Sequence, residues 1–378
     1  MRKFPQSQSH SLKSSEADMH IGIVGGGVIG LLSAYFLAKE GVKVSIFEKG
    51  NIGQESSWAG GGIVSPLFPW RYPDAITNLS NWSKEFYNSL STHLRDTTTI
   101  DPEVYQCGIY WLELDDIQSA IHWAETQSLK ASLINSGELR ARLPALSSHY
   151  SNALFSPLIS NVRNPKLSQS LKVYLSSKGV SLFENSAIKD IATKGEHWVL
   201  RTDESSVQLD KILITAGAWS GELLATLGLS LPVEPVKGQM ILYKCEPGFL
   251  PSMVLAKGRY AIPRRDGHIL VGSTLEHEGF DKTPTDVARE CLQASAEELI
   301  PALARQPIVG HWAGLRPGSP DGIPFIGPVS GFEGLWLNCG HYRNGLVLAP
   351  ASCRLLADLM LGREPIVDPT PYAPSARL

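Results

Sequence analysis

Residues 21–48 read IGIVGGGVIGLLSAYFLAKEGVKVSIFE, and this stretch decides the fold. The apolar run Ile21 to Val24 predicts a short buried strand, Leu31 to Lys39 predicts a helix, and Val42 to Phe47 predicts a second buried strand. A strand, a helix and a strand in this order predict a β-α-β unit built on a parallel sheet.

Three glycines lie between the first strand and the helix. Gly25, Gly27 and Gly30 form the pattern G-x-G-x-x-G, and Glu48 follows Gly25 by 23 positions. In dinucleotide-binding folds these glycines allow a tight turn, a close approach to the pyrophosphate and close helix packing, and an acidic residue about 20 positions on binds ribose hydroxyls. The pattern therefore predicts a dinucleotide site with its phosphates at the helix N-terminus. The carboxylate of Glu48 disfavours NADP, because it would repel a 2′-phosphate.

Two further segments suit the same ligand. A glycine-rich loop is usually a flexible surface segment, but Ser56 to Ile63 places two hydroxyls, Ser56 and Ser57, before three glycines. Hydroxyls can bind phosphate oxygens, and a backbone without side chains can lie against a planar group. The segment Ala216-Gly217-Ala218-Trp219 directly follows the strand predicted at Lys211 to Thr215, and ligands bind at the carboxyl ends of such strands.

The middle of the chain has a different pattern. Gln239 to Tyr243, Tyr260 to Pro263 and His268 to Gly272 predict antiparallel strands, and Asp266-Gly267 predicts the hairpin that joins the last two. Near the C-terminus, a predicted strand at Leu335 to Asn338 is followed by a predicted helix at Leu346 to Met360, as in the N-terminal β-α-β unit. We expect an α/β fold: a Rossmann-like domain of residues 19–98, 160–230 and 309–378, a β-rich substrate and interface domain of residues 99–159 and 231–308, and a flexible leader at residues 1–18.

Composition excludes several classes of protein. The 378 residues carry 34 Lys and Arg against 37 Asp and Glu, so the basic footprint of a nucleic-acid binder is missing. The five cysteines form no C-x-x-C pair, and no histidines pair at i and i+4, so neither a disulfide framework nor a metal site is predicted. The apolar run Ile21 to Ala38 contains five glycines and is explained by the nucleotide turn. We therefore expect a cytoplasmic protein with no membrane attachment, for which Met19 is an alternative start.

Two arginines are flanked by glycines. Arg316 lies in GLRPG at 314–318, and Arg343 lies in GHYRNG at 340–345, so we expect both on loops that pack against something bulky. Either one alone is equally well explained as an exposed arginine. Together they could bind one carboxylate through bidentate hydrogen bonds.

The sequence resembles the D-amino acid oxidase family of flavoproteins, and most closely its glycine oxidases of thiamine biosynthesis. The resemblance runs from Ile21 nearly to the C-terminus. Beyond the first glycine pattern, six stretches carry it, in the order of the family: SSWAGGGIVSP from Ser56, TAGAWSGELL from Thr215, PVKGQM from Pro235, GRYAIPRRDGHILVGST from Gly258, HWAGLRPGSPDGIPFIG from His311 and GHYRNGLVLAP from Gly340.

The resemblance implies a noncovalent FAD. It implies cofactor contacts at Val28, Ile29, Glu48, Lys49, Ser56, Ser57, Gly61, Gly62, Ile63, Ile188, His341, Tyr342, Arg343, Asn344, Gly345, Leu346 and Val347, besides the glycines above. It places Arg316 and Arg343 at the substrate carboxylate and the hydroxyl of Tyr260 beside it. No acid or base is assigned, because the cofactor itself supplies the electron sink.

The implied reaction is the oxidation of glycine, sarcosine or a small D-amino acid to the imine, with O2 reduced to H2O2. The imine then hydrolyses to the 2-oxo acid, glyoxylate in the case of glycine, and ammonia, or passes to a thiazole synthase. A homo-oligomer, often a tetramer, is also implied. A quinone-linked D-amino acid dehydrogenase, an NAD-dependent dehydrogenase and a noncatalytic flavin-binding protein are the alternatives.

Overall fold

The predicted β-α-β unit forms the centre of a six-stranded sheet in the computed structural model, which describes residues 19–378. Strand β1 (His20–Val24) lies between β12 (Lys211–Ile214) and β2 (Lys43–Phe47), and both pairings are parallel. Ile23 is in register with Leu213 on one side and with Ile46 on the other. The leader predicted at residues 1–18 lies outside the described residues.

The remaining strands of this sheet extend it on both sides. Its order is β18-β19-β12-β1-β2-β8, and only β18 runs antiparallel to its neighbour. The added strands are β18 (Phe325–Pro328), β19 (Leu335–Cys339) and β8 (Ser181–Phe183). Strands β1 and β12 are neighbours although nearly 190 residues separate them, so segments that are distant in sequence lie side by side in this sheet.

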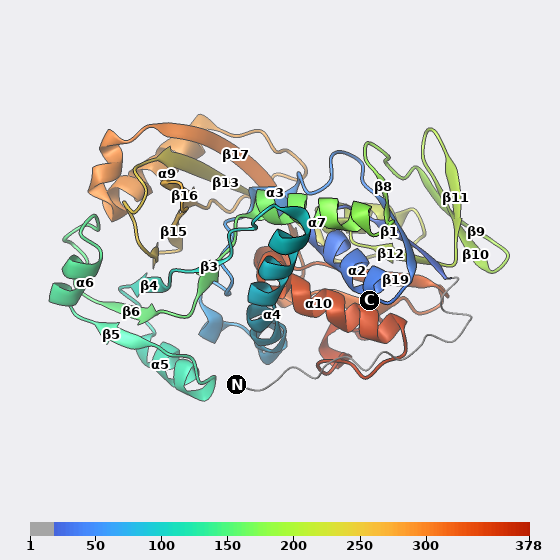
Figure 1. The fold of residues 1–378 in the computed structure, drawn as a ribbon, viewed down its shortest axis with the longest axis horizontal. Helices are drawn as coiled ribbons and strands as arrows, with labels where there is room; N and C mark the ends of the chain where they lie inside the picture. The colour runs from blue at the N-terminus through green and yellow to red at the C-terminus, as the bar shows by residue number, and fades with distance from the viewer. Residues whose placement is uncertain (1–18) are drawn as a thin grey trace.

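Helices cover one face of this sheet (Figure 1). They are α2 (Val28–Lys39), α4 (Asp74–Thr98), α7 (Asn164–Ser177) and α10 (Gly345–Met360). The small antiparallel sheet of β9 (Asp190–Lys194), β10 (His197–Arg201) and β11 (Ser206–Leu209) lies against the other face. Alternate residues of the strands supply the two cores: Leu213 packs towards the helices, whereas Ile212 and Ile214 pack towards the small sheet.

The middle of the chain forms an eight-stranded sheet of order β17-β13-β16-β15-β14-β4-β6-β5. Its strands are β4 (Ile109–Leu112), β5 (Ser132–Ile134), β6 (Ala153–Ser156), β13 (Glu234–Lys244), β14 (Met253–Ala256), β15 (Arg259–Pro263), β16 (His268–Gly272) and β17 (Ile308–Gly318). The hairpin predicted at Asp266-Gly267 is confirmed: β15 and β16 pair antiparallel, and Gly267 takes the left-handed φ of 87° that its turn needs. Short helices border this sheet: α5 (Ile117–Thr126), α6 (Ser136–Arg142) and α9 (Asp286–Leu299). The remaining short elements are β3 (Tyr105–Gln106), β7 (Ser160–Asn161), α3 (Ser56–Ala59) and α8 (Ser220–Ala225).

Three local predictions need correction. Arg316 lies on strand β17 and not on a loop, because residues 308–318 pair along their whole length with β13. Ser56 to Ala59 forms the one-turn helix α3 before the glycines, so only the second half of that segment is a loop. Helix α2 begins at Val28, one turn earlier than predicted, because Gly30 is helical.

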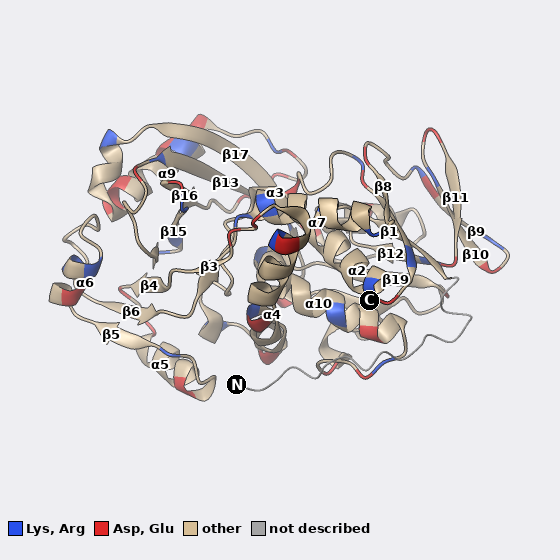
Figure 2. Ribbon diagram, viewed as in Figure 1, with Lys and Arg blue, Asp and Glu red and all other residues tan. Residues whose placement is uncertain are grey.

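The domain boundaries stay a prediction. The sheets separate along the expected segments, but β17, which begins where the predicted boundary at residue 309 lies, belongs to the eight-stranded sheet. Acidic and basic residues are interspersed along the ribbon (Figure 2). No helix within residues 19–378 has the length and apolar character that crossing a bilayer requires.

Candidate active site

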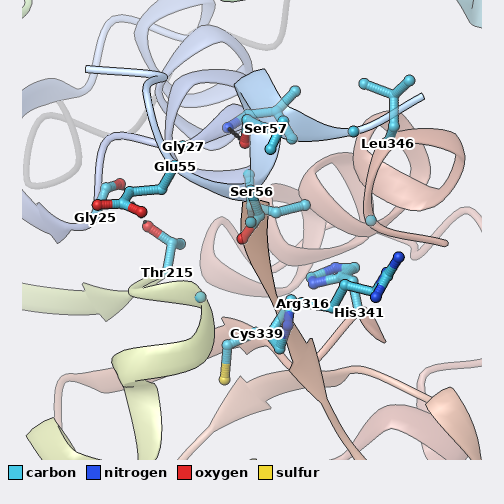
Figure 3. A pocket seen from close by; sticks show the side chains of 18 of the residues that line it. Gly25, Gly27, Glu55, Ser56, Ser57, Thr215, Arg316, Cys339, His341 and Leu346 are labelled. Atoms are coloured by element: carbon cyan, nitrogen blue, oxygen red, sulfur yellow. Dashed lines mark hydrogen bonds between the residues drawn. The ribbon is translucent and has the colours of Figure 1, made fainter. Parts of the chain in front are cut away.

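One elongated pocket runs between the six-stranded sheet and the eight-stranded sheet. Figure 3 shows the turn at Gly25 and Gly27, the serines Ser56 and Ser57, and His341 of the C-terminal loop around the same hollow. Every residue predicted to contact cofactor or substrate lines this pocket except Gly30. The fold thus brings together segments that lie more than 300 residues apart in the chain.

Gly25 and Gly30 build the turn at the nucleotide end. Gly25 has a φ of 112°, and a Cβ on it would lie 2.5 Å from the carbonyl oxygen of Thr215. A Cβ on Gly30 would lie 2.0 Å from the carbonyl oxygen of Gly25. Any side chain at Gly30 would push helix α2 off the turn, so this residue serves the packing of the helix and not the pocket wall.

Glu48 lines the same end of the pocket. It is 7% exposed, its Oε2 accepts a hydrogen bond from the amide of Gly26 at 2.7 Å, and its Oε1 accepts one from Gly50 at 3.1 Å. Two backbone donors hold the carboxylate at the end of β2. Each carboxylate oxygen can accept more than one hydrogen bond, so hydroxyl groups of a ligand can still bind it.

Ser57 lies at the N-terminus of α2. Its Oγ accepts a hydrogen bond from the amide of Val28 at 2.8 Å, so the hydroxyl proton is available to a ligand oxygen. The hydroxyl of Ser56 donates to the carbonyl of Leu315 and so joins α3 to β17. Amide dipoles and a serine hydroxyl at one helix N-terminus are the donors that a pyrophosphate prefers.

The glycine loop after α3 forms a wall with little side-chain bulk. A Cβ on Gly62 would lie 2.1 Å from the carbonyl of Val162, and Gly62 has a φ of 85°. A Cβ on Gly61 would lie 2.8 Å from Ile262. The buried guanidinium of Arg264 donates to the carbonyl of Gly61 at 2.8 Å and ties this loop to the hairpin. Such a wall suits a large planar group.

Arg316 and Tyr260 lie at the other end of the pocket. Arg316 donates from Nη1 to the carbonyl of Lys237 at 3.2 Å and from Nη2 to Oγ of Ser273 at 2.6 Å. Burial lowers the pKa of its guanidinium, which nevertheless stays charged at neutral pH. The hydroxyl of Tyr260 makes only a long contact, 3.8 Å, to Sδ of Met240. This end offers a fixed cation and a phenol to a small anionic ligand.

The positions of the two arginines differ. Arg343 lines the same pocket as Arg316, but its side chain is exposed, whereas that of Arg316 is half-buried. Arg343 lies in a short 3₁₀ turn directly before α10. Both cations face one hollow, so the predicted pairing on one carboxylate is compatible with the fold.

His341 and Asn344 belong to the loop that starts α10. His341 is buried, which lowers the pKa of its imidazole to about 3, and its Nε2 lies 3.0 Å from Oγ of Ser352. It is therefore neutral at physiological pH. The buried Nδ2 of Asn344 has no hydrogen-bond partner in the described part of the chain, so it can donate to a ligand in the pocket.

Sequence reasoning missed several lining residues. Asn164, whose buried Oδ1 has no hydrogen-bond partner among the described residues, begins helix α7, and no local signal in the sequence predicted this helix. Thr215 and Ser273 lie in quoted stretches and directly follow strands, a signal that could have identified both. Among residues 19–378, no group of three or more His, Cys, Asp and Glu side chains is placed to hold a metal ion.

Comparisons with known proteins agree with this geometry. The model of the FAD dependent oxidoreductase family matches residues 20–359. The chain belongs to this family. It is similar to the glycine oxidase of Pseudomonas aeruginosa, with 59% identity over 94% of this chain and 98% of that protein. It is also similar to the bifunctional protein ThiO/ThiG of a Synechocystis species, with 31% identity over 90% of this chain and 51% of that protein.

A solved structure shares the fold. The crystal structure of glycine oxidase from Geobacillus kaustophilus has a TM-score of 0.90 at 30% identity, covering 94% of this chain and 98% of that one. The predicted α/β fold and membership of the D-amino acid oxidase family are thus confirmed. As a member of this family, the protein is an oxidoreductase that depends on FAD.

The pocket suits FAD on its own chemistry. Its two ends differ: donors for phosphates and an acceptor for ribose hydroxyls gather at one end, and a wall of glycines continues towards the other. The buried Oδ1 of Asn164 and Nδ2 of Asn344 have no hydrogen-bond partner among residues 19–378, and both residues line the pocket. A ligand with a diphosphate, a ribose and a flat ring satisfies this set of groups.

The neutral state of His341 predicts a pH dependence of stability. Below its ordinary pKa of about 6.5 the unfolded chain binds a proton there that the folded protein does not, so the free energy of unfolding falls as pH decreases. Between pH 7 and pH 5 this residue should account for a loss of about 2 kcal/mol. Urea unfolding of the holoprotein at both pH values measures it. His341→Gln should lose less than the wild type, and equal losses in the two proteins contradict the prediction.

Proposed function

We propose that the protein oxidises glycine, and also sarcosine and small D-amino acids, to the imine while O2 is reduced to H2O2. The observation that carries the proposal is the guanidinium of Arg316, which lines the pocket, is held there by Lys237 and Ser273, and has further N–H donors for a ligand. A carboxylate bound there would bring its α-carbon beside the glycine wall. The names of the similar glycine oxidases support the choice of substrate.

The proposed cofactor contacts divide along the pocket. The turn Gly25 to Ile29 with Ser56 and Ser57 binds the diphosphate, and Glu48 binds the ribose. Lys49, Ile188 and Gly217 line the adenine side, and the ring lies between the loop Gly61 to Ile63 and the segment His341 to Val347. Their common place in one pocket supports this assignment.

The substrate end orients the amino acid. Arg316 and Arg343 bind the carboxylate, and the hydroxyl of Tyr260 lies beside it. Ile63 and Met240, both buried, leave an apolar wall where a side chain on the α-carbon would lie. FAD, when bound, supplies the acceptor for the hydride of the α-carbon, and the chain fixes which face of that carbon is presented.

The amine must be neutral when the hydride leaves. Two arginines in the pocket disfavour a nearby ammonium. Burial lowers the pKa of His341 to about 3, so its imidazole is too weak a base to take the proton of the amine. The amine therefore loses its proton to solvent. We expect kcat/KM to rise with pH until the substrate amine is fully deprotonated.

The attachment of FAD is proposed to be noncovalent. Among residues 19–378, Cys339 is the one cysteine that lines the pocket. Burial raises the pKa of its thiol to about 12, so it is a poor nucleophile. Denaturation should therefore release the yellow colour into solution.

The proposal also covers the fate of the imine, the cellular compartment and the oligomeric state. Iminoacetate hydrolyses to glyoxylate and ammonia, or is passed to a thiazole synthase. The name of the bifunctional ThiO/ThiG relative, of which this chain spans about half, supports the second route. We further propose a cytoplasmic homo-oligomer, often a tetramer in this family. The five cysteines are all free, which agrees with a reducing compartment.

Oxygen consumption tests the reaction. With glycine as substrate, the purified holoprotein should consume O2 and release one H2O2 and one ammonia for each O2, and sarcosine should release methylamine in place of ammonia. D-alanine and D-proline complete the substrate set. Reduction of a quinone analogue without O2 uptake would contradict the proposal and favour a dehydrogenase.

Arg316 variants test the site. Loss of a charge-assisted partner costs about 2 to 4 kcal/mol, so Arg316→Met should lower kcat/KM for glycine by roughly 30-fold to 1000-fold while the protein stays yellow. Arg377→Met is the matched control, since that arginine binds carbonyl groups of the segment Pro320 to Pro324 outside the pocket. Equal kcat/KM in the wild type and Arg316→Met would make Arg316 a structural residue.

A further inference from the structure

Residues 273–285 form a strap along the pocket, between β16 and α9. The strap begins at Ser273, which lines the substrate end. Further on, Phe280 stacks on Trp219 with ring centroids 5.5 Å apart, and Lys282 binds Glu55 at 2.8 Å. Trp219 and Glu55 line the cofactor end. The strap thus touches both ends of the pocket while it carries almost no regular structure of its own.

Lys237 of β13 lies beneath the middle of this strap. Its backbone exchanges two hydrogen bonds with Glu276, at 2.9 and 3.0 Å. Its side chain is 0% exposed, and Nζ lies 3.4 Å from Glu278, 3.6 Å from Asp281 and 3.9 Å from Glu276. One buried cation therefore faces three carboxylates that all belong to the strap.

The position of the strap depends on Lys237, because three carboxylates of the strap lie around its ammonium group. Three carboxylates around one point repel one another, and the ammonium of Lys237 lies within 3.9 Å of all three. Glu278 and Asp281 are about half exposed, so water would draw them outwards once the cation is gone. Gln239 adds neutral anchors: its amide donates to Oγ1 of Thr274, and its Nε2 donates to Glu276.

The strap also fixes Arg316. Nη2 of Arg316 donates to Oγ of Ser273 at the start of the strap, and Nη1 donates to the carbonyl of Lys237 itself. The guanidinium lies against Gly238, where a Cβ would come within 2.2 Å of it. Its orientation thus depends on a hydroxyl whose position is set by the strap.

We propose that Lys237 is a positioning residue for substrate binding: by drawing Glu276, Glu278 and Asp281 inwards, it holds the strap so that Ser273 orients Arg316 towards the carboxylate. This deepens the proposed function, because it rests on the role of Arg316 in that function. The side chain of Lys237 itself is not among the residues that line the pocket.

Acetate is the probe, because it offers the carboxylate without an oxidisable amine. Binding to the holoenzyme is followed as a change in the visible flavin spectrum. Lys237→Met should weaken acetate binding by about tenfold, and Lys237→Arg should recover most of the loss. The kcat/KM for glycine should fall mainly through a higher KM. Lys189→Met is the matched control and should bind acetate as the wild type does, because it removes an exposed lysine that precedes β9 and pairs with Asp203 between β10 and β11.

A second variant covers the case in which Lys237→Met does not fold. Glu278→Gln/Asp281→Asn removes two of the carboxylates at exposed positions, and it should weaken acetate binding by about threefold. Unchanged acetate affinity in folded, yellow Lys237→Met, or in this double variant, overturns the proposal. So does a wild type that does not bind acetate. A wild type that binds acetate but does not oxidise glycine contradicts the proposed function. In that case the acetate affinity of the Lys237 variants still tests the positioning role of Lys237.

Discussion

The close approach of helix α2 to the turn after β1 is the constraint on which the site depends. It exists because Gly30 has no side chain where the carbonyl of Gly25 lies, and because Gly25 takes a left-handed conformation beside Thr215. This contact points the N-terminus of α2 into the pocket and leaves the amide of Gly26 facing Glu48. The phosphate end of the pocket is therefore a property of the backbone, and the neighbouring loops are built against it.

At the substrate end, the cost of burying the charge of Arg316 is set against the attraction of a carboxylate ligand. Arg316 is a cation that burial makes costly, and its partners in the protein are a carbonyl and a hydroxyl. A carboxylate ligand would supply the missing counter-charge, and Arg343 adds a second positive group at the exposed side of the same hollow. In the proposed function, a small amino acid is therefore selected by charge at one side of its α-carbon and by an apolar wall at the other.

Much of this arrangement could be predicted because its signals are local. The glycine pattern, Glu48 and the Asp266-Gly267 hairpin each depend on neighbours in sequence, and the fold confirms the elements that they predict. Strand β17 could not be predicted in this way. Its glycines, histidine and proline show no alternation of apolar residues, and its conformation comes from pairing with β13, about 80 residues away. The contact between Lys237 and the strap could not be predicted for the same reason, since the tertiary fold brings Glu276, Glu278 and Asp281 to this lysine.

The visible spectrum of the holoprotein under anaerobic conditions tests the central claim most directly. With glycine added, the flavin absorbance near its long-wavelength maximum should bleach, and admission of O2 should restore it with release of H2O2. A yellow protein whose spectrum glycine leaves unchanged, at concentrations where sarcosine and small D-amino acids also fail to bleach it, would contradict the assignment of the Arg316 pocket to amino-acid oxidation.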